Sequence, residues 1–371
     1  MKVSLLQENF SKALGIVSRS IAPKAALPVL ANIAIATEKG RLKLSATNLE
    51  CGINLWLGAK VEKEGSIAVP AKILTEFVSS LPPEKINLEV KENNLFLSTP
   101  GYKANFAGSS LSEFPPIASS SGKADLIFKK EEFAENLAQV VFAAATDEGR
   151  PVLTGVLLRL EGQKLSLVAT DGYRLSVKKI EIKEGLLKED LLVPAKALLE
   201  VARISQEKGD EEKEIKMALT NDKNQIVFSL PGIDYSSRLI DGEFPDFAKI
   251  IPETNETKAE FDREEFFRAV KTASIFAREQ ANIVKLKFEP GKLTVSAETP
   301  QVGGNETEIE AKVSGSKLEI AFNCRFLLDL LGAVVCEELV FEAGGALNPG
   351  VFRPKGDASF FHLIMPVRIQ A

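Results

Sequence analysis

Histidine is almost absent from this sequence, and the residue patterns of catalytic and metal sites are missing from it. The 371 residues include one histidine, His362, and three cysteines, none of them in CxxC spacing. No nucleophile elbow, phosphate-binding loop or metal-ligand spacing occurs. His362 therefore suits packing better than chemistry, and Asp171 and Asp246 are typical of acids in turns and loops. We expect a protein that is not an enzyme and that uses no metal or other cofactor.

Long apolar runs are missing as well. The first ten residues, MKVSLLQENF, lack the apolar core of a signal peptide. No run approaches the roughly 20 apolar residues that a membrane-spanning helix needs. An odd number of cysteines does not suggest a disulfide framework. These absences favour a cytoplasmic protein with no membrane partner.

The charge balance limits how the chain could meet nucleic acid. Its 46 basic and 51 acidic residues give a formal net charge of −5. This balance argues against wrapping nucleic acid with the whole surface, but a local basic face remains open because electrostatic fields are local. Hydrophobic content of 45% and charged content of 26% are typical of a soluble globular protein. The length suggests two or three domains.

Three amphipathic helices are predicted, each at the start of one third of the chain. Apolar residues spaced i, i+4, i+7 lie on one face of a helix. The three sets with this spacing are Phe10, Leu14 and Val17; Phe133, Leu137 and Val140; and Phe266, Val270 and Ala273.

A pair of apolar strands follows each helix, in residues 27–53, 150–177 and 281–309. The first two copies match at one constant offset of 123, from Pro28 and Pro151 onward. Alternating apolar and polar residues indicate half-buried antiparallel strands. Only the central copy carries the tetrapeptide of residues 171–174, Asp-Gly-Tyr-Arg, at the turn that follows. This turn is therefore the first candidate for function.

A second helix follows in each third, after residues 69–72, 193–196 and 322–325. Pro70 and Pro194 suit the first turn of a helix, and Asn323 is the predicted N-cap of the third. Each third of the chain is therefore predicted to contain a helix, strands, a second helix and further strands, which is the order of an α+β unit. Residues 119–125 and 252–258 resemble interdomain linkers, and 206–216 a solvated loop. We expect domains at 1–120, 121–252 and 253–371.

Head-to-tail repeats leave one unmatched surface at each end of the chain. Unpaired sheet edges there would invite aggregation unless another chain covers them. A ring closed by a second or third chain solves this problem.

Three motifs within this frame resemble those of the bacterial sliding clamp family, the β subunit of DNA polymerase III. They are VATDGYRL (168–175), LIDGEFPDFAKIIP (239–252) and HLIMPVRI (362–369), and the resemblance covers essentially the whole chain. It implies three clamp-type domains, each with two helices on antiparallel sheet, and a head-to-tail homodimer forming a closed six-domain ring. The ring would encircle duplex DNA whatever its sequence. It would tether the DNA polymerase III catalytic subunit, the clamp loader, and other polymerases and repair proteins.

The resemblance also implies an apolar pocket for partner peptides between the second and third domains. A short apolar peptide binds in a preformed apolar cleft, where a few polar groups fix its orientation. Met365 can adapt its shape, and Gly172 permits close backbone approach. On the residues alone, apolar strand ends are more often core. Many family members have histidine at the place of Tyr173, and this chain runs two residues past their usual end, to Gln370 and Ala371. The implied pocket residues are Leu153, Thr170, Gly172, Tyr173, Arg174, Leu175, Pro245, Ile250, Asn323, Phe326, Leu363, Ile364, Met365, Pro366, Val367 and Arg368.

A basic lining facing DNA is implied in the same way. A sliding contact uses long cations on phosphates and avoids base readout. Singly, most of these cations would suit solvated helix faces, and Lys24 and Arg150 are favoured because they hold matching places in two repeats. The set is Lys12, Arg19, Lys24, Lys72, Arg150, Lys196, Arg203, Arg268, Lys271, Arg278 and Arg325.

The last implied site closes the ring, between an edge strand of the first domain and the third domain of the next chain. Phe106 matches the strand, and Ile275 and Phe276 match the facing helix. Phe106 suits an ordinary core position equally well. Two alternatives remain: a ring or crescent scaffold that binds partner peptides without encircling DNA and, more distantly, an enzyme acting on small molecules.

Overall fold

The chain divides into two compact units. The computed structural model describes residues 1–21, 27–120, 122–147, 149–182, 185, 187, 189–206, 213–279, 281–300 and 303–368. Unit 1 comprises residues 1–131, 184–186 and 200–239, and unit 2 comprises 132–183, 187–199 and 240–371. No helix in the described segments is long and apolar enough to cross a membrane.

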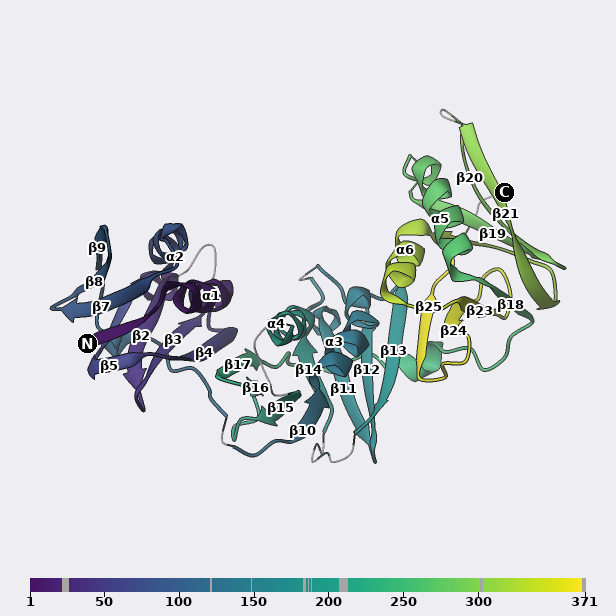
Figure 1. The fold of residues 1–371 in the computed structure, drawn as a ribbon. Helices are drawn as coiled ribbons and strands as arrows, with labels where there is room; N and C mark the ends of the chain where they lie inside the picture. The colour runs from purple at the N-terminus through teal and green to yellow at the C-terminus, as the bar shows by residue number, and fades with distance from the viewer. Residues whose placement is uncertain are drawn as a thin grey trace. The chain divides into compact units, whose positions relative to one another are not determined.

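Unit 1 is built on two antiparallel sheets (Figure 1). Its strands are β1 (Lys2–Leu6), β2 (Asn32–Glu38), β3 (Arg41–Thr47), β4 (Cys51–Gly58), β5 (Lys60–Lys63), β6 (Ser66–Pro70), β7 (Lys85–Lys91), β8 (Asn94–Thr99), β9 (Tyr102–Ala107), β10 (Leu126–Lys129), β15 (Glu214–Leu219), β16 (Gln225–Leu230) and β17 (Ile233–Arg238). One sheet has the order β5-β1-β7-β8-β9, and the other β10-β15-β16-β17-β4-β3-β2-β6. The half-buried alternation predicted from the sequence is seen only in the first half of β3, where Leu42 and Leu44 are buried. From Leu44 to Thr47 every residue of β3 is buried, and so is every residue of β12 (Lys164–Thr170) after Lys164, so these strands are covered on both faces.

Helices α1 (Gln7–Val17) and α2 (Ala71–Ser80) lie against each other in unit 1 (Figure 1). Phe10, Leu14 and Val17 are fully buried, as the helical spacing predicted. The side chain of Gln7 donates a 2.7 Å hydrogen bond to the carbonyl of Val78, which ties the two helices together.

Unit 2 contains one sheet of twelve strands. They are β11 (Gly155–Glu161), β12 (Lys164–Thr170), β13 (Arg174–Glu181), β14 (Leu191–Pro194), β18 (Thr257–Asp262), β19 (Ile283–Glu289), β20 (Lys292–Thr299), β21 (Gly303–Gly315), β22 (Leu318–Asn323), β23 (Glu338–Ala343), β24 (Gly350–Pro354) and β25 (Phe360–Ile364). The order is β14-β11-β12-β13-β25-β24-β23-β18-β21-β20-β19-β22. Helices α5 (Arg263–Ala277) and α6 (Cys324–Ala333) pack together, whereas α3 (Lys130–Ala138) and α4 (Ala195–Ser205) include residues of both units.

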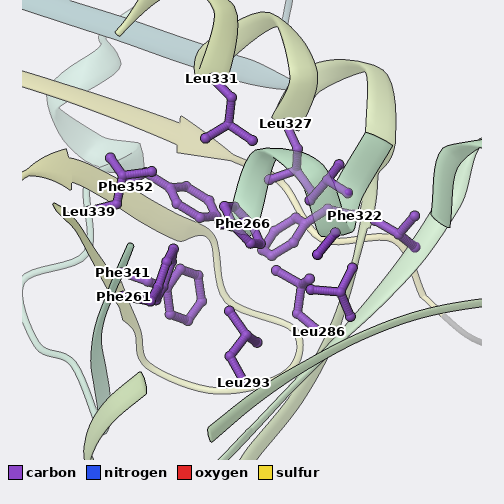
Figure 2. Packing of buried hydrophobic residues seen from close by; sticks show 14 of the residues in the cluster. Phe261, Phe266, Leu286, Leu293, Phe322, Leu327, Leu331, Leu339, Phe341 and Phe352 are labelled. Atoms are coloured by element: carbon purple, nitrogen blue, oxygen red, sulfur yellow. The ribbon is translucent and has the colours of Figure 1, made fainter. Parts of the chain in front are cut away.

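A cluster of phenylalanines fills the core under α5 and α6 (Figure 2). Phe288 stacks on Phe341 with 4.4 Å between ring centroids, and Phe341 lies 5.0 Å from Phe352. Each buried aromatic side chain stabilises the fold by roughly 1.5–3 kcal/mol relative to exposure. Phe266 contributes to this cluster from the predicted apolar face of α5.

Four local predictions were wrong in their boundaries. Residues Pro28–Ala31 and Pro151–Thr154 form short 3-10 turns, η2 and η5, and the strands begin after them. Proline has no N–H for a strand ladder and favours such a turn. Pro70 and Pro194 are the last residues of β6 and β14, so α2 and α4 begin one residue later.

The remaining differences concern helix and loop ends. Val140 lies beyond α3, although it is fully buried. In the expected loop 206–216, residues 207–212 lie outside the described residues, and β15 already begins at Glu214. The expected N-cap is confirmed, since the Asn323 side chain accepts a 2.9 Å hydrogen bond from the N–H of Arg325.

Candidate functional site

The turn between β12 and β13 is fixed by its own side chains. Thr170 Oγ1 donates to the carbonyl of Arg174 at 2.6 Å and accepts from the N–H of Gly172 at 3.0 Å. Asp171 Oδ1 accepts from the N–H groups of Tyr173 (2.9 Å) and Arg174 (3.1 Å). Gly172 adopts a left-handed φ of +91°, which glycine tolerates without strain. The turn is therefore rigid, and it leaves the Tyr173 side chain 61% exposed.

Arg174 joins this turn to more distant parts of unit 2. Its guanidinium donates to Asp171 at 3.0 Å, to Asp329 of α6 at 2.6 Å and to the carbonyl of Phe142 at 2.8 Å. It also lies 4.5 Å above the Phe326 ring and 5.5 Å from that of Phe142. These charge-assisted and cation–π contacts occupy the guanidinium, which is only 9% exposed. Arg174 therefore positions the turn and is not displayed at the surface.

The chain after β25 is held by backbone hydrogen bonds on both sides. β25 pairs with β13, with Ile364 opposite Arg174. The N–H of Met365 donates to the carbonyl of Tyr173 at 2.9 Å, and that of Val367 donates to Ala321 in β22 at 2.8 Å. Met365 remains 39% exposed at this place.

An apolar cluster lies under this segment. Leu175 and Leu363 are fully buried in it, together with residues of β11, β12, β14 and β24. The segment after residue 240 packs against the cluster through Phe244, Phe247 and Ile251. Ile250 is 42% exposed beside them in the sequence.

All the predicted pocket residues belong to unit 2. The buried members are Leu153, Thr170, Arg174, Leu175, Leu363 and Ile364. The half-buried members are Asn323, Phe326, Pro366 and Val367, and the exposed ones are Gly172, Tyr173, Pro245, Ile250, Met365 and Arg368. Sequence reasoning missed Phe142, Asp329 and Phe247, which contact pocket residues from other segments. Only the aromatic spacing of the motif around Phe247 could have indicated one of them.

His362 is packed inside the same region. Its side chain is fully buried, with Nδ1 2.6 Å from Ser176 Oγ and the ring 5.1 Å from that of Phe142. Burial, together with the positive charge of Arg174, lowers the pKa of His362 to about 3. The imidazole is therefore neutral and structural at ordinary pH.

Two surface hollows lie elsewhere, in unit 1. One, of about 380 Å³, includes Lys123 and Asp234, and the other, of about 310 Å³, includes Ser4 and Phe96. No predicted pocket residue lines either hollow. Within the described ranges, no group of three or more His, Cys, Asp or Glu residues could hold a metal ion.

The predicted lining cations lie mostly on helices. Exposed members on helices or directly after one are Lys12, Lys72, Lys196, Arg203, Arg268, Lys271, Arg278 and Arg325. Arg19 is half-buried and pairs with Glu200 at 3.2 Å. Arg150 is exposed but donates to the carbonyl of Asp171 at 3.0 Å. Lys24 lies outside the described residues.

The three residues predicted to close the ring differ in exposure. Phe106 on β9 is 7% exposed, and its ring lies 5.7 Å from that of Phe77. Phe276 packs against the unit 2 core, whereas Ile275 is 60% exposed. Phe106 is therefore already part of the chain's own packing.

Comparison with known families covers nearly the whole chain. Family models described as DNA polymerase III beta subunit match residues 1–117 (N-terminal domain), 128–246 (central domain) and 248–368 (C-terminal domain). The chain belongs to this family. The beta sliding clamp of Staphylococcus aureus is 29% identical over 379 residues, covering 99% of each chain.

Solved structures of sliding clamps agree in fold. That from Bacillus subtilis has a TM-score of 0.94 at 26% identity, and that from Pseudomonas aeruginosa bound to griselimycin has 0.93 at 26%. Both similarities cover 100% of each chain. The expected α+β fold with three clamp domains is confirmed.

Family membership also decides the function. The protein is a sliding clamp, a non-catalytic processivity factor that forms a dimer, encircles DNA and tethers DNA polymerase III and other partners that carry clamp-binding peptides. It is not a scaffold that leaves DNA aside.

Proposed function

We propose that this clamp tethers its partners through one apolar surface of unit 2, the partner surface, with Tyr173, Ile250 and Met365 at its rim and Leu175 and Leu363 in its floor. One observation carries the proposal: the hydrogen bond from Met365 to Tyr173 fixes two exposed apolar side chains next to a rigid turn. A preformed apolar surface lowers the ordering cost of binding a short peptide. The other predicted pocket residues support this surface from below or extend its edge.

A single charge placed on the rim tests this proposal. In Met365→Asp, an apolar peptide would have to bury a carboxylate, so affinity should fall at least about 100-fold. Leu347→Asp is the matched control, because Leu347 is 66% exposed and lies outside the partner surface. Fluorescence anisotropy with a labelled peptide from a DNA polymerase III catalytic subunit gives the affinities, and sedimentation verifies the dimer. Unchanged affinity in Met365→Asp refutes the assignment.

The domain boundaries 1–120, 121–252 and 253–371 are also a proposal. The sheets continue across both junctions, because β4 pairs with β17 and β13 pairs with β25. The polar segments around residues 120 and 252 support these boundaries. Limited proteolysis should cut there first.

We further infer how two chains close the ring. In the first two repeats, the strand after the turn pairs with the last strand of the next domain: Cys51 lies opposite Ser237, and Arg174 opposite Ile364. The strand of the third repeat is β21, whose residues 303–307 pair only with β20 among the described residues. The last strand of the first domain is β9, which pairs only with β8 there. β21 of one chain therefore accepts β9 of the next.

The repeat predicts the register of this contact. Ala297 pairs with Asn305 as Ala169 pairs with Ser176, so Asn305 is the counterpart of Ser176. Two residues earlier in each strand, Gly303 is the counterpart of Arg174. Tyr102 is the counterpart of Ile233, since each opens the last strand after a tight hairpin. Phe106 then lies opposite Gly303, and Lys103 opposite Glu306. Opposite charges at facing positions stabilise paired strands by roughly 0.2–1 kcal/mol.

We assign the DNA-facing role to the exposed cations of the helices. Helix cations that bind phosphates without base contacts let a ring slide. Arg19 contributes less in this proposal, because it is half-buried and pairs with Glu200. We place the protein's action in the cytoplasm, where a bacterial clamp meets the chromosome.

A further inference from the structure

The turn between β3 and β4 repeats four side-chain hydrogen bonds of the turn at the partner surface. Thr47 Oγ1 donates to the carbonyl of Cys51 at 2.7 Å and accepts from the N–H of Leu49 at 3.0 Å. Asn48 Oδ1 accepts from the N–H groups of Glu50 (3.0 Å) and Cys51 (2.7 Å). Leu49 has a left-handed φ of +74°, like Gly172. The sequences Thr-Asn-Leu-Glu-Cys and Thr-Asp-Gly-Tyr-Arg thus build the same backbone turn.

The neighbouring strand end is repeated as well. The N–H of Arg238 donates to the carbonyl of Glu50 at 2.8 Å, as that of Met365 donates to Tyr173 at 2.9 Å. β17, which ends at Arg238, pairs antiparallel with β4, the strand after the first turn. β25, which ends just before Met365, pairs in the same way with β13, the strand after the second turn, and the two pairs have the same register. The backbone frame of the partner surface therefore occurs twice in one chain, once in each unit.

The side chains on the two frames have opposite character. Glu50 stands where the partner surface has Tyr173, and Arg238 where it has Met365, and both are exposed. An apolar peptide on the first frame would strip water from a carboxylate and a guanidinium without giving either a partner. Leu49, 47% exposed, adds a side chain where Gly172 has none.

The floor of the first frame is also different. Gly52 takes the place of Leu175, the floor residue of the partner surface. A Cβ built on Gly52 would lie 2.6 Å from Ile117 Cγ2, so a side chain from just before the 119–125 linker fills this space. Ser119 and Ser120 hold the linker there by hydrogen bonds with Asn54 (2.9 Å) and Asp234 (3.0 Å).

We propose that Glu50 and Arg238 are specificity-determining residues that confine partner peptides to one surface per chain. The repeat supplies two frames for docking an extended apolar peptide, and the two charges make the first frame unfavourable for it. The proposal rests on the proposed partner surface in unit 2. It identifies the excluded ligand as the same apolar peptide that the second frame binds.

The experiment gives the first frame the rim side chains of the partner surface, tyrosine at position 50 and methionine at position 238, in the full-length dimer. Isothermal titration with a polymerase-derived peptide measures sites per chain for the wild type, Met365→Asp, and each of these with E50Y/R238M added. E50D/R238K, which keeps both charges, is the matched control. We expect one site per chain in the wild type and none in Met365→Asp. Adding E50Y/R238M to either protein should create one more site per chain. The peptide should bind this new site at least about ten-fold more tightly than it binds the first frame of the matched E50D/R238K protein. Adding Leu49→Gly together with Ile117→Ala, which removes the side chain that fills the space over Gly52, should strengthen the new site further.

Each outcome separates the two proposals. Full affinity in Met365→Asp with one site overturns the partner surface in unit 2. No additional site in folded, dimeric E50Y/R238M, even with Leu49→Gly and Ile117→Ala added, overturns the role of Glu50 and Arg238. Two sites in the wild type overturn it as well. Circular dichroism and sedimentation show whether each variant is folded and dimeric.

Discussion

Arg174 and Asp329 form an ion pair with a separation of 2.6 Å between residues 155 positions apart in the sequence. The pair fastens the turn before β13 to helix α6, and the Arg174 side chain is nearly buried. Because the same guanidinium also holds Asp171 and the Phe142 carbonyl, the shape of the partner surface depends on this one residue.

Arg174→Met should lower both stability and peptide affinity. The variant leaves Asp171 and the Phe142 carbonyl without their donor, which should reduce the free energy of unfolding by about 2 kcal/mol. Urea unfolding measures this change. Arg159→Met is the control, because the Arg159–Asp190 pair is more exposed and should be worth less than about 1 kcal/mol. Equal losses in the two variants would show that the Arg174 network is not special.

His362 should make stability depend on pH. Its pKa is about 3 in the folded chain and 6.5 for an unperturbed side chain, so between these values the unfolded state binds a proton that the folded state does not. Stability should therefore fall as pH drops below 6.5, with a slope approaching about 1.4 kcal/mol per pH unit. Chemical denaturation between pH 7 and 5 measures the slope, and His362→Asn should flatten it. As His362 is the only histidine, the same slope in both proteins would refute the assignment.

Gly172→Ala should weaken peptide binding through the turn. A Cβ at Gly172 would meet Arg150 Nη1 at 3.0 Å, and φ of +91° is unfavourable for alanine. We expect a loss of about 1–2 kcal/mol in stability and a weaker partner surface. Gly162→Ala has a similar backbone strain at φ +63° with open space around it, so it should leave peptide affinity unchanged. Anisotropy titration of both variants decides whether the turn matters for binding.

Charge reversal should test the register of ring closure. Lys103→Glu or Glu306→Lys alone should weaken the dimer, since each places like charges opposite each other. The double variant K103E/E306K restores the pair and should regain most of the affinity. Sedimentation at low protein concentration measures the dimer dissociation constants. If the double variant is as weak as the sum of the single ones, another register operates.

The helix cations should govern retention on DNA. K72E/R268E/R278E should weaken retention on nicked circular DNA and lower its salt dependence, because fewer phosphate contacts remain. K216E/K285E/K312E makes the same charge change on exposed strand positions and should have little effect. Gel filtration with labelled clamp measures the bound fraction, and linearising the circle should release the wild type. If both triple variants lost the same fraction of DNA-bound clamp, the net charge of the protein alone would explain the effect.

Much of the fold could be predicted because its signals are local. The spacing of Phe10, Leu14 and Val17 requires only helical geometry, and the alternation in β3 requires only strand geometry. The prolines at 28 and 151 misled the strand boundaries, since proline constrains its own φ but does not say which turn it begins. Phe106 was ambiguous because an apolar residue on an edge strand can face either its own core or a neighbour.

The sequence by itself determined the threefold repeat, the family and the turn of residues 171–174, because periodicity and motif spacing are properties of neighbours in the chain. Only the tertiary structure decided that Arg174 is sequestered by Asp329 and Phe142, and that the Thr47 turn copies the Thr170 turn. These relations depend on which distant groups fold against each other. Local spacing carries no information about such partners, so the sequence could name Arg174 as a pocket residue but could not show that its guanidinium is a nearly buried anchor of the turn.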